Sequence, residues 1–271
     1  KVTNFWAHYR RCVAKISCQL PSEHNKYVEN TLKHEKVRFT TMPKDVFSFR
    51  QFDVRQDRCA MKVGTDGVLL GAWAEGGRRI LDIGAGTGVV ALMMAQRFPD
   101  SVVEGVEADG QAACQAAENA HAFARVAIHH VRLQEWEPGE PYDCMVSNPP
   151  FFIDSLKTPN SQRTLARHDV DLSFADILAF AKRHLTHEGV LSVVLPTEVV
   201  ERFTETAYLS GFRMCRQAMI KTTNRKPFKR QLLAFSKDTS RRFERAEHCL
   251  MGADGQRSEW YHDLTKAFYV F

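Results

Sequence analysis

Two short motifs in this sequence could carry chemistry, and the first is rich in glycine. Residues 82–88 read Asp-Ile-Gly-Ala-Gly-Thr-Gly, between an apolar run and a helical pattern. Glycines at such a turn let a ligand approach the backbone closely. The motif differs from the dinucleotide fingerprint G-x-G-x-x-G because position 89 is Val. Asp82 would be a poor neighbour for a pyrophosphate at a helix N-terminus, but it suits a cationic or zwitterionic ligand.

A second acidic residue follows the next expected strand. Glu107 lies nineteen residues after Gly88, and a carboxylate at that place can accept hydrogen bonds from both ribose hydroxyls of an adenosine group. Together with the glycine loop, this arrangement resembles the class I, Rossmann-like methyltransferases that use S-adenosylmethionine. The resemblance implies that the cofactor is held by Asp82, Gly84, Ala85, Gly86, Gly88, Glu107 and Ala108.

The second motif is Asn148-Pro149-Pro150-Phe151, at the end of another expected strand. Two prolines remove two backbone donors, so the Asn148 side-chain oxygen and the Pro149 carbonyl can each accept one hydrogen of a planar amino group. An exocyclic amine is a weak nucleophile, and two such acceptors stabilise the charge that develops on it. Phe151 can stack on the base that carries the amine. The element resembles the (Asn/Asp)-Pro-Pro-(aromatic) signature of methyltransferases that act on planar amino groups, with Asn148 also beside the cofactor.

This element by itself leaves the methyl acceptor open. Adenine-N6 enzymes usually carry Tyr at the fourth position, whereas this chain has Phe151, which also occurs in guanine-N2 ribosomal RNA methyltransferases. Enzymes that methylate a glutamine in release factors share the element too. A non-catalytic RNA-binding module that retains the fold is a further alternative.

A longer stretch narrows the family. Residues 47–54 and 56–73 resemble the opening of the bacterial tRNA1(Val) adenine-37 N6-methyltransferase family, and residues 231–235 and 264–271 match it near the end. The resemblance implies methyl transfer from S-adenosylmethionine to N6 of an adenine in the tRNA anticodon loop. It also implies that the methionine part of the cofactor lies beside Lys62, Gly64, Thr65 and Asp66.

One position departs from that family. Where the family usually has an acid at the end of the third strand, near the cofactor adenine, this chain has Arg132. We expect Leu133 and Gln134 to supply the adenine contacts instead, with weaker cofactor affinity.

A basic segment follows the two motifs. Residues 213–245 hold eleven basic and two acidic side chains, and the charge is densest in residues 221–230, around Phe228. Basic groups beside an aromatic ring suit a phosphate backbone with exposed bases. The sequence therefore predicts that tRNA is bound by Lys221, Arg225, Lys226, Lys229 and Arg230.

These motifs need a scaffold that brings strand ends together. From residue 79 onward apolar strands and helical patterns alternate, which is typical of a parallel sheet with helices on both faces. Ligands of such sheets bind at the carboxyl ends of the strands, where both motifs fall. We predict an α/β, Rossmann-like class I methyltransferase fold with a mostly parallel seven-stranded sheet and an antiparallel C-terminal strand pair. The expected strands are residues 79–83, 101–106, 127–131, 142–147, 190–195, 214–221 and 231–235, and the expected helices are residues 89–97, 111–122, 174–187, 199–209 and 258–268.

Composition sets the remaining expectations. The 271 residues are 44% hydrophobic and 25% charged, as in ordinary globular proteins, and no apolar run approaches the ~18 residues of a membrane span. The seven cysteines include no C-x-x-C spacing, which argues for a reducing compartment and against a zinc site. We expect a cytoplasmic protein, with a monomer favoured and with no metal or membrane partner.

The formal charge of +5 is confined to one end of the chain. Residues 1–41 hold eight basic and three acidic side chains, so residues 42–271 carry no net charge. The first segment shows no clear hydrophobic period. We expect residues 1–41 to be a basic, poorly ordered extension, and residues 42–271 to be the S-adenosylmethionine-dependent domain.

Overall fold

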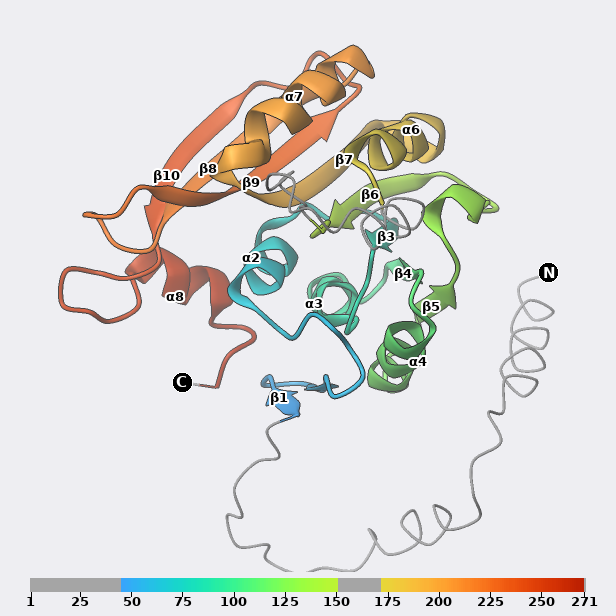
Figure 1. The fold of residues 1–271 in the computed structure, drawn as a ribbon, viewed down its shortest axis with the longest axis horizontal. Helices are drawn as coiled ribbons and strands as arrows, with labels where there is room; N and C mark the ends of the chain where they lie inside the picture. The colour runs from blue at the N-terminus through green and yellow to red at the C-terminus, as the bar shows by residue number, and fades with distance from the viewer. Residues whose placement is uncertain (1–44, 151–171, 271) are drawn as a thin grey trace, which may run out of the picture. The chain divides into compact units, whose positions relative to one another are not determined.

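The structure is a computed structural model that describes residues 45–150 and 172–270 (Figure 1). The chain divides into two units between Met42 and Pro43, and every described element belongs to the second unit. The expected N-terminal extension, residues 1–41, lies outside the described residues, and so does Phe151.

One large mixed sheet organises the described residues, with strand order β10-β8-β9-β7-β6-β3-β4-β5. Its parallel part consists of β3 (Arg79–Ile83), β4 (Val102–Glu107), β5 (Val126–His130), β6 (Tyr142–Ser147) and β7 (Leu185–Pro196). Strand β9 (Phe228–Ser236) pairs antiparallel with β7 and with β8 (Arg213–Lys221). The predicted fold class is confirmed, including the C-terminal antiparallel pair.

The sheet has one strand more than the seven that the sequence predicts. Strand β10 (Glu244–Cys249) pairs parallel with β8 at the edge of the sheet. Its first four residues are exposed, so the segment lacks the apolar pattern by which a strand is recognised. The predicted helix over residues 174–187 also ends earlier, at His184, because β7 begins at the buried Leu185 and continues through the polar residues 186–188.

Helices cover both faces of the sheet, as predicted (Figure 1). Alternate residues of a strand point to opposite faces, and Ile80 and Leu81 of β3 accordingly belong to two different hydrophobic clusters. The first cluster includes residues of α2 (Thr65–Trp73), α3 (Val89–Arg97) and α8 (Glu259–Thr265). The second includes residues of α6 (Phe174–His184) and α7 (Val200–Leu209). The remaining named elements are α4 (Gly110–Asn119), the short helices η2 (Leu133–Glu135) and η3 (Thr197–Val199), and the hairpin of β1 (Val46–Ser48) and β2 (Asp53–Arg55).

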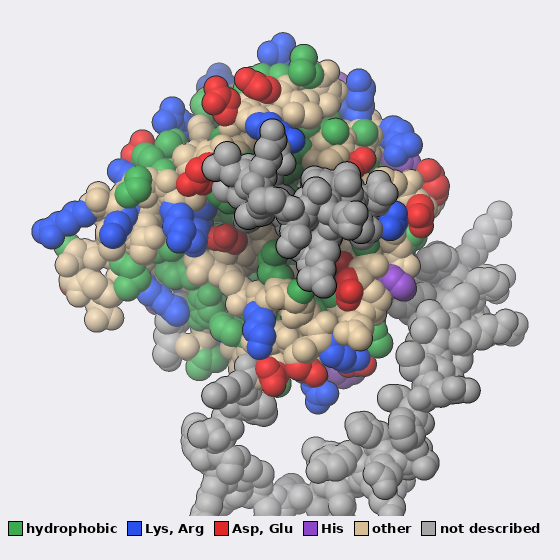
Figure 2. All heavy atoms as spheres, in the orientation of Figure 1, with side chains coloured by type: hydrophobic (Ala, Val, Ile, Leu, Met, Phe, Trp, Pro, Cys, Tyr) green, Lys and Arg blue, Asp and Glu red, His purple; other side chains and the backbone are tan. Residues whose placement is uncertain are grey.

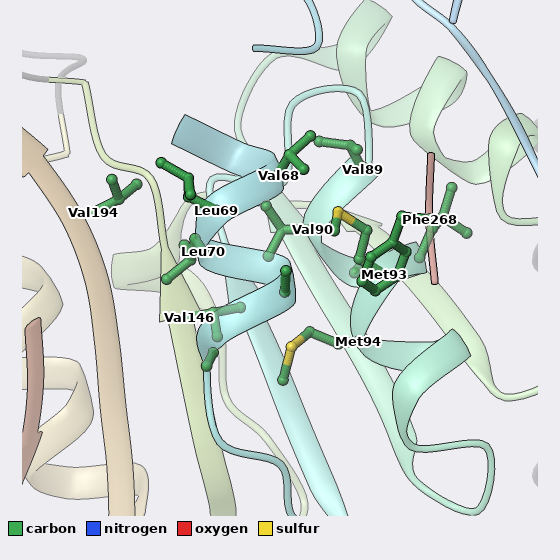
Figure 3. Packing of buried hydrophobic residues seen from close by; sticks show 14 of the residues in the cluster. Val68, Leu69, Leu70, Val89, Val90, Met93, Met94, Val146, Val194 and Phe268 are labelled. Atoms are coloured by element: carbon green, nitrogen blue, oxygen red, sulfur yellow. The ribbon is translucent and has the colours of Figure 1, made fainter. Parts of the chain in front are cut away.

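Helix α2 packs directly against α3 (Figure 3). Val68, Leu69 and Leu70 are completely buried, and a Cβ at Gly71 would lie 2.9 Å from Cβ of Met93. The absence of a side chain at Gly71 therefore permits the close approach of the two helices. The helix begins immediately after Gly64, which places Thr65 and Asp66 in its first turn.

The two ends of the described chain meet on the face that α2 and α3 cover. The Arg50 backbone N–H donates a hydrogen bond to the Phe268 carbonyl at 2.7 Å, and the Tyr269 ring packs against Phe47 and Phe49. Phe268 itself is buried in the first cluster. Among residues 45–150 and 172–270, no helix is both long and apolar enough to cross a membrane.

Candidate active site

The glycine loop joins β3 to α3 and leaves its backbone accessible. Gly84, Gly86 and Gly88 have φ angles of 72°, 54° and 80°, which side chains with a Cβ rarely adopt. A Cβ at Gly86 would meet no atom within 4 Å, whereas one at Gly88 would lie 3.2 Å from Cβ of Ala116 in α4. Gly86 thus leaves space for a ligand, and Gly88 allows the loop to pack against α4.

The Glu107 carboxylate fixes the position of this loop. One carboxylate oxygen accepts a hydrogen bond from the Gly86 backbone N–H at 2.8 Å, and the other accepts one from the Asp109 N–H at 2.9 Å. An ionised carboxylate has about four lone-pair sites, so it can still accept hydrogen bonds from ligand hydroxyls. Glu107 is therefore oriented before any ligand binds.

Asp82 lies deeper, at 1% exposure. Its carboxylate accepts a hydrogen bond from the Ala91 N–H at 3.0 Å. The pKa of Asp82 is raised to about 7, chiefly because the side chain is buried; the hydrogen bond from Ala91 lowers this pKa, and the nearby negative charge of Glu107 raises it. A positively charged ligand in the adjoining cavity would favour the ionised form.

Two cavities meet at Asn148. Both are lined by Met61, Gly84, Gly86 and Asn148, and their volumes are about 620 Å³ and about 350 Å³. The larger cavity is further lined, among others, by Glu107, Ala108, Arg132, Leu133, Gln134 and Pro150. The smaller cavity is further lined, among others, by Lys62, Gly64, Thr65, Asp66, Asp82, Ala85 and Arg230. The structure therefore brings together all the predicted cofactor residues except Gly88, although their contact with a cofactor stays a prediction.

The loop of residues 57–61 also lines the larger cavity, and the sequence did not point to it as part of the site. Gln115 of α4 holds this loop, because its side-chain oxygen accepts from the Arg58 N–H at 3.1 Å and its amide donates to Asp57 at 2.6 Å. Arg58 also forms an ion pair with Glu118 of the same helix. The sequence does show a glutamine, Gln115, within an alanine-rich helical segment, but nothing in that pattern reveals that its partners are in residues 57–61.

The smaller cavity carries charges of both signs. Nε of Arg230 lies 2.8 Å from Oδ1 of Asp66, and Nζ of Lys62 lies 3.2 Å from Oδ1 of Asp45. Burial raises the pKa of Asp66, while Arg230 and Lys229 act in the opposite direction. Cations and carboxylates in one small cavity suit a zwitterion such as the amino-acid end of S-adenosylmethionine, so the residues present fit that cofactor.

Asn148 follows β6 and has a buried acceptor. Its amide nitrogen donates to the Met61 sulfur at 3.7 Å, whereas its side-chain oxygen is buried without a hydrogen-bond partner among the described residues. A buried acceptor without a partner costs about 1–3 kcal/mol, and a donor on a bound substrate would remove that cost. Pro149 is buried beside it, and Pro150 lines the larger cavity.

The predicted RNA-binding residues lie on and beside the loop between β8 and β9. Arg225, Lys226 and Lys229 are exposed, and Figure 2 shows Lys and Arg side chains gathered on this side of the molecule, at its left. The Lys221 ammonium lies 4.3 Å from the centre of the Phe228 ring. Arg230 differs from the other four because its side chain lines the smaller cavity.

The described residues include no group of three or more His, Cys, Asp or Glu side chains that could hold a metal ion.

Comparison with known proteins gives a consistent result. Residues 36–218 match the methyltransferase small domain family. A tRNA1(Val) (adenine(37)-N6)-methyltransferase of Klebsiella pneumoniae is 42% identical over 238 residues, which cover 85% of this chain and 97% of that protein. The enzyme of the same name from Bacteroides fragilis is 42% identical over 243 residues, with 84% and 99% covered.

Solved structures share the fold. A predicted O-methyltransferase of Agrobacterium tumefaciens superposes with a TM-score of 0.58 at 18% identity, over 76% of this chain and 98% of that chain. A 16S ribosomal RNA N2 G1207 methyltransferase of Thermus thermophilus, solved with S-adenosylmethionine and guanosine, superposes with a TM-score of 0.51 at 20% identity, over 71% and 50%. At these identities the likeness concerns the fold alone.

Proposed function

We propose that this chain, which belongs to the tRNA1(Val) (adenine(37)-N6)-methyltransferases within the methyltransferase small domain family and is an S-adenosylmethionine-dependent enzyme, acts on the exocyclic N6 amine of adenine 37 in the anticodon loop of tRNA1(Val). The observation that carries this proposal is the buried side-chain oxygen of Asn148, which lies where the two cavities meet and has no hydrogen-bond partner among residues 45–150 and 172–270.

The cofactor would occupy both cavities. Lys62, Asp66 and Asp82 face the smaller one and suit its charged methionine part, while Glu107 faces the larger one and suits the ribose. Gly64, Thr65 and the glycine loop supply backbone around it, with Leu133 and Gln134 near the adenine. When bound, the cofactor supplies an electrophilic methyl group.

The chain itself mainly positions the amine. The Asn148 oxygen and the Pro149 carbonyl accept its two hydrogens, which draws electron density onto the nitrogen and stabilises the positive charge that develops there. An in-line displacement gains most of its acceleration from such positioning. We propose that Pro150 shapes the cavity and that Phe151 stacks on the adenine.

The direct test is mass spectrometry of nucleosides from tRNA incubated with the protein and S-adenosylmethionine. Wild-type protein should produce N6-methyladenosine, and Asn148→Ala should lower kcat by about 10²- to 10³-fold, with cofactor affinity by calorimetry little changed. Near-normal turnover by Asn148→Ala would remove the proposed role. Methylated guanosine would assign the same chemistry to another base, and the absence of any methylated nucleoside would contradict a tRNA substrate.

We further propose that the loop residues Lys221, Arg225, Lys226 and Lys229 contact the tRNA backbone, with Arg230 at the base of this loop. The positive charge of all five, and the exposure of Arg225, Lys226 and Lys229, support this role. We also propose a cytoplasmic monomer in which residues 1–41 form a basic extension outside the catalytic domain. The division of the chain between Met42 and Pro43 supports that boundary.

A further inference from the structure

A third cavity lies apart from the two just described, where β8 and β10 end and α8 begins. Its volume is about 360 Å³, which is at the lower end of the range for small-ligand sites. Its lining consists of Lys221, Asn224, Glu247, His248, Cys249, Ser258 and Trp260. None of these residues lines the two cavities of the active site, and only Lys221 has been proposed above to contact tRNA.

One wall of the cavity is aromatic and flat. The rings of His248 and Trp260 stack with their centres 3.9 Å apart and their planes within 4°. Burial lowers the pKa of His248, so the imidazole is neutral at pH 7 and offers a stacking surface. The Lys221 ammonium beside Phe228 adds a positive charge at the edge. Flat rings next to cations are the usual means of binding unpaired nucleotides.

The polar groups of the cavity can read a base edge. The Asn224 side-chain oxygen accepts from the Cys249 thiol at 2.8 Å, which leaves its amide nitrogen oriented as a donor. The Glu247 carboxylate supplies an acceptor for amino or imino hydrogens. Residues 221–230, next to the cavity, contain five basic and no acidic side chains, and this charge complements an RNA backbone.

The register of the sheet places this cavity close to the active site. His248 of β10 pairs with Ile220 of β8, and Ile220 pairs with Arg230 of β9. Neighbouring strands lie about 4.8 Å apart, so the backbones of His248 and Arg230 are roughly 10 Å apart. Residues paired across a sheet direct their side chains to the same face. Consistently, Arg230 contacts Asp66 of α2, and His248 contacts Trp260 of α8 on that same face.

We propose that this third cavity is a second nucleotide subsite, which binds one unpaired base of the RNA substrate against His248 and Trp260 while the target adenine occupies the active site. The inference rests on the proposed function, because it requires an RNA substrate. It adds a base-binding pocket to the backbone contacts of the basic loop. The subsite would thereby set the position of the RNA strand relative to Asn148.

The test compares His248→Ala with His248→Phe in the full-length protein, using a tRNA1(Val) transcript. Loss of stacking should raise KM for the transcript about tenfold, and the flat ring of His248→Phe should restore it. Both variants should keep kcat within about twofold and bind S-adenosylmethionine as wild type does. His187→Ala is the matched control and should leave KM for the transcript unchanged. His187 is exposed and lies near the start of β7, at the opposite end of that strand from Pro196.

A set of RNA variants identifies the base that is bound. A transcript is made for each unpaired anticodon-loop position other than 37, with an abasic nucleotide at that position. With wild-type protein, one abasic transcript should have a KM about tenfold higher than the intact transcript. With His248→Ala, that abasic transcript and the intact transcript should have the same KM. The subsite would be overturned if His248→Ala left KM unchanged. It would also be overturned if every abasic substitution raised KM by the same factor with His248→Ala as with wild-type protein. If wild-type protein methylates no tRNA at all, the proposed function fails, and the two failures are thus distinguished.

Discussion

The two acids that flank the glycine loop differ in environment and therefore in behaviour. Glu107 is partly exposed at the end of β4 and accepts two backbone hydrogen bonds, which hold the glycine loop in place. Asp82 is buried and accepts one, and its pKa is raised to about 7. The charge of Asp82 therefore varies near neutrality.

Asp82→Asn should change how stability depends on pH. Between about pH 4 and pH 7 the folded protein retains a proton on Asp82 that the unfolded chain has lost, so this group lowers the free energy of unfolding as pH rises. The variant removes that loss and should be more stable than wild type at pH 8, by about 2–4 kcal/mol. Urea titrations at pH 5.5 and pH 8 measure the difference, which should be smaller at the lower pH.

The exposed aspartate Asp100 provides the control for this measurement. Asp100→Asn should leave the pH dependence of unfolding as in wild type. If Asp82→Asn and wild type lose stability equally between pH 5.5 and pH 8, the raised pKa of Asp82 is not the cause.

At the scale of elements, two segments set the shape of the smaller cavity. The first turn of α2 supplies Thr65 and Asp66, and the start of β9 supplies Arg230. The ion pair between Asp66 and Arg230 joins the two elements. The position of α2 on the sheet and on α3 therefore determines the geometry of the smaller cavity, the proposed site of the methionine part of the cofactor.

Gly71→Ala should destabilise the protein although alanine favours helices. The new Cβ would lie 2.9 Å from Cβ and 3.0 Å from Sδ of Met93, and overpacking of this kind costs about 1–3 kcal/mol. That cost exceeds the gain of up to about 1 kcal/mol in helix propensity, so thermal unfolding should shift to lower temperature. Gly139→Ala, whose Cβ would meet nothing within 4 Å, should have little effect. A melting temperature for Gly71→Ala at or above that of wild type would contradict the packing argument.

Two substitutions at the loop between β8 and β9 should affect different ligands, one the tRNA and the other the cofactor. Lys226→Glu should weaken tRNA binding and reduce the slope of log affinity against log salt by about 0.7–0.9, with unchanged affinity for S-adenosylmethionine. Arg230→Gln should weaken S-adenosylmethionine binding about tenfold, because it removes a charge-assisted contact beside the smaller cavity. Filter binding and calorimetry measure the two affinities. Equal effects of both variants on the cofactor would show that the loop acts as one unit.

The sequence could predict those parts of the site that lie at the ends of buried strands. Strands covered on both faces appear as continuous apolar runs, so the places of Asp82, Glu107 and Asn148 follow from the pattern. Several elements were not predicted, among them the β1–β2 hairpin, α2 and β10, and two of these show why. Helix α2 is buried on nearly all sides and lacks an amphipathic period, and β10 is exposed at an edge. The loop of residues 57–61 depends on Gln115, fifty-seven residues after Arg58, which no local pattern reveals.

At the scale of the whole molecule, charge is distributed unevenly. Residues 1–41 carry the formal excess of five positive charges, and residues 42–271 are neutral overall. Within the neutral part, residues 221–230 form a concentrated basic segment beside the third cavity and the active site. The proposed contacts with RNA thus depend on the local placement of charge rather than on the total.

A variant that begins at Met42 should retain the activity. All the elements that line the three cavities lie after Pro43, so kcat and the affinity for S-adenosylmethionine should match those of the full chain. Affinity for tRNA should fall only at low salt, where non-specific attraction to a basic extension is strongest. Steady-state kinetics at two salt concentrations test this, and an insoluble or inactive variant would show that residues 1–41 belong to the catalytic unit.

The strand order has a consequence for synthesis on the ribosome. Strand β9 lies between β7 and β8 in the sheet, although both precede it in the chain. A nascent chain therefore emerges with one edge of β7 unpaired, and β8 finds its native neighbour only after Ser236 has been added. At roughly 5–20 residues per second, the growing polypeptide exposes this apolar edge for several seconds. That interval is when binding by a ribosome-associated chaperone would be most useful.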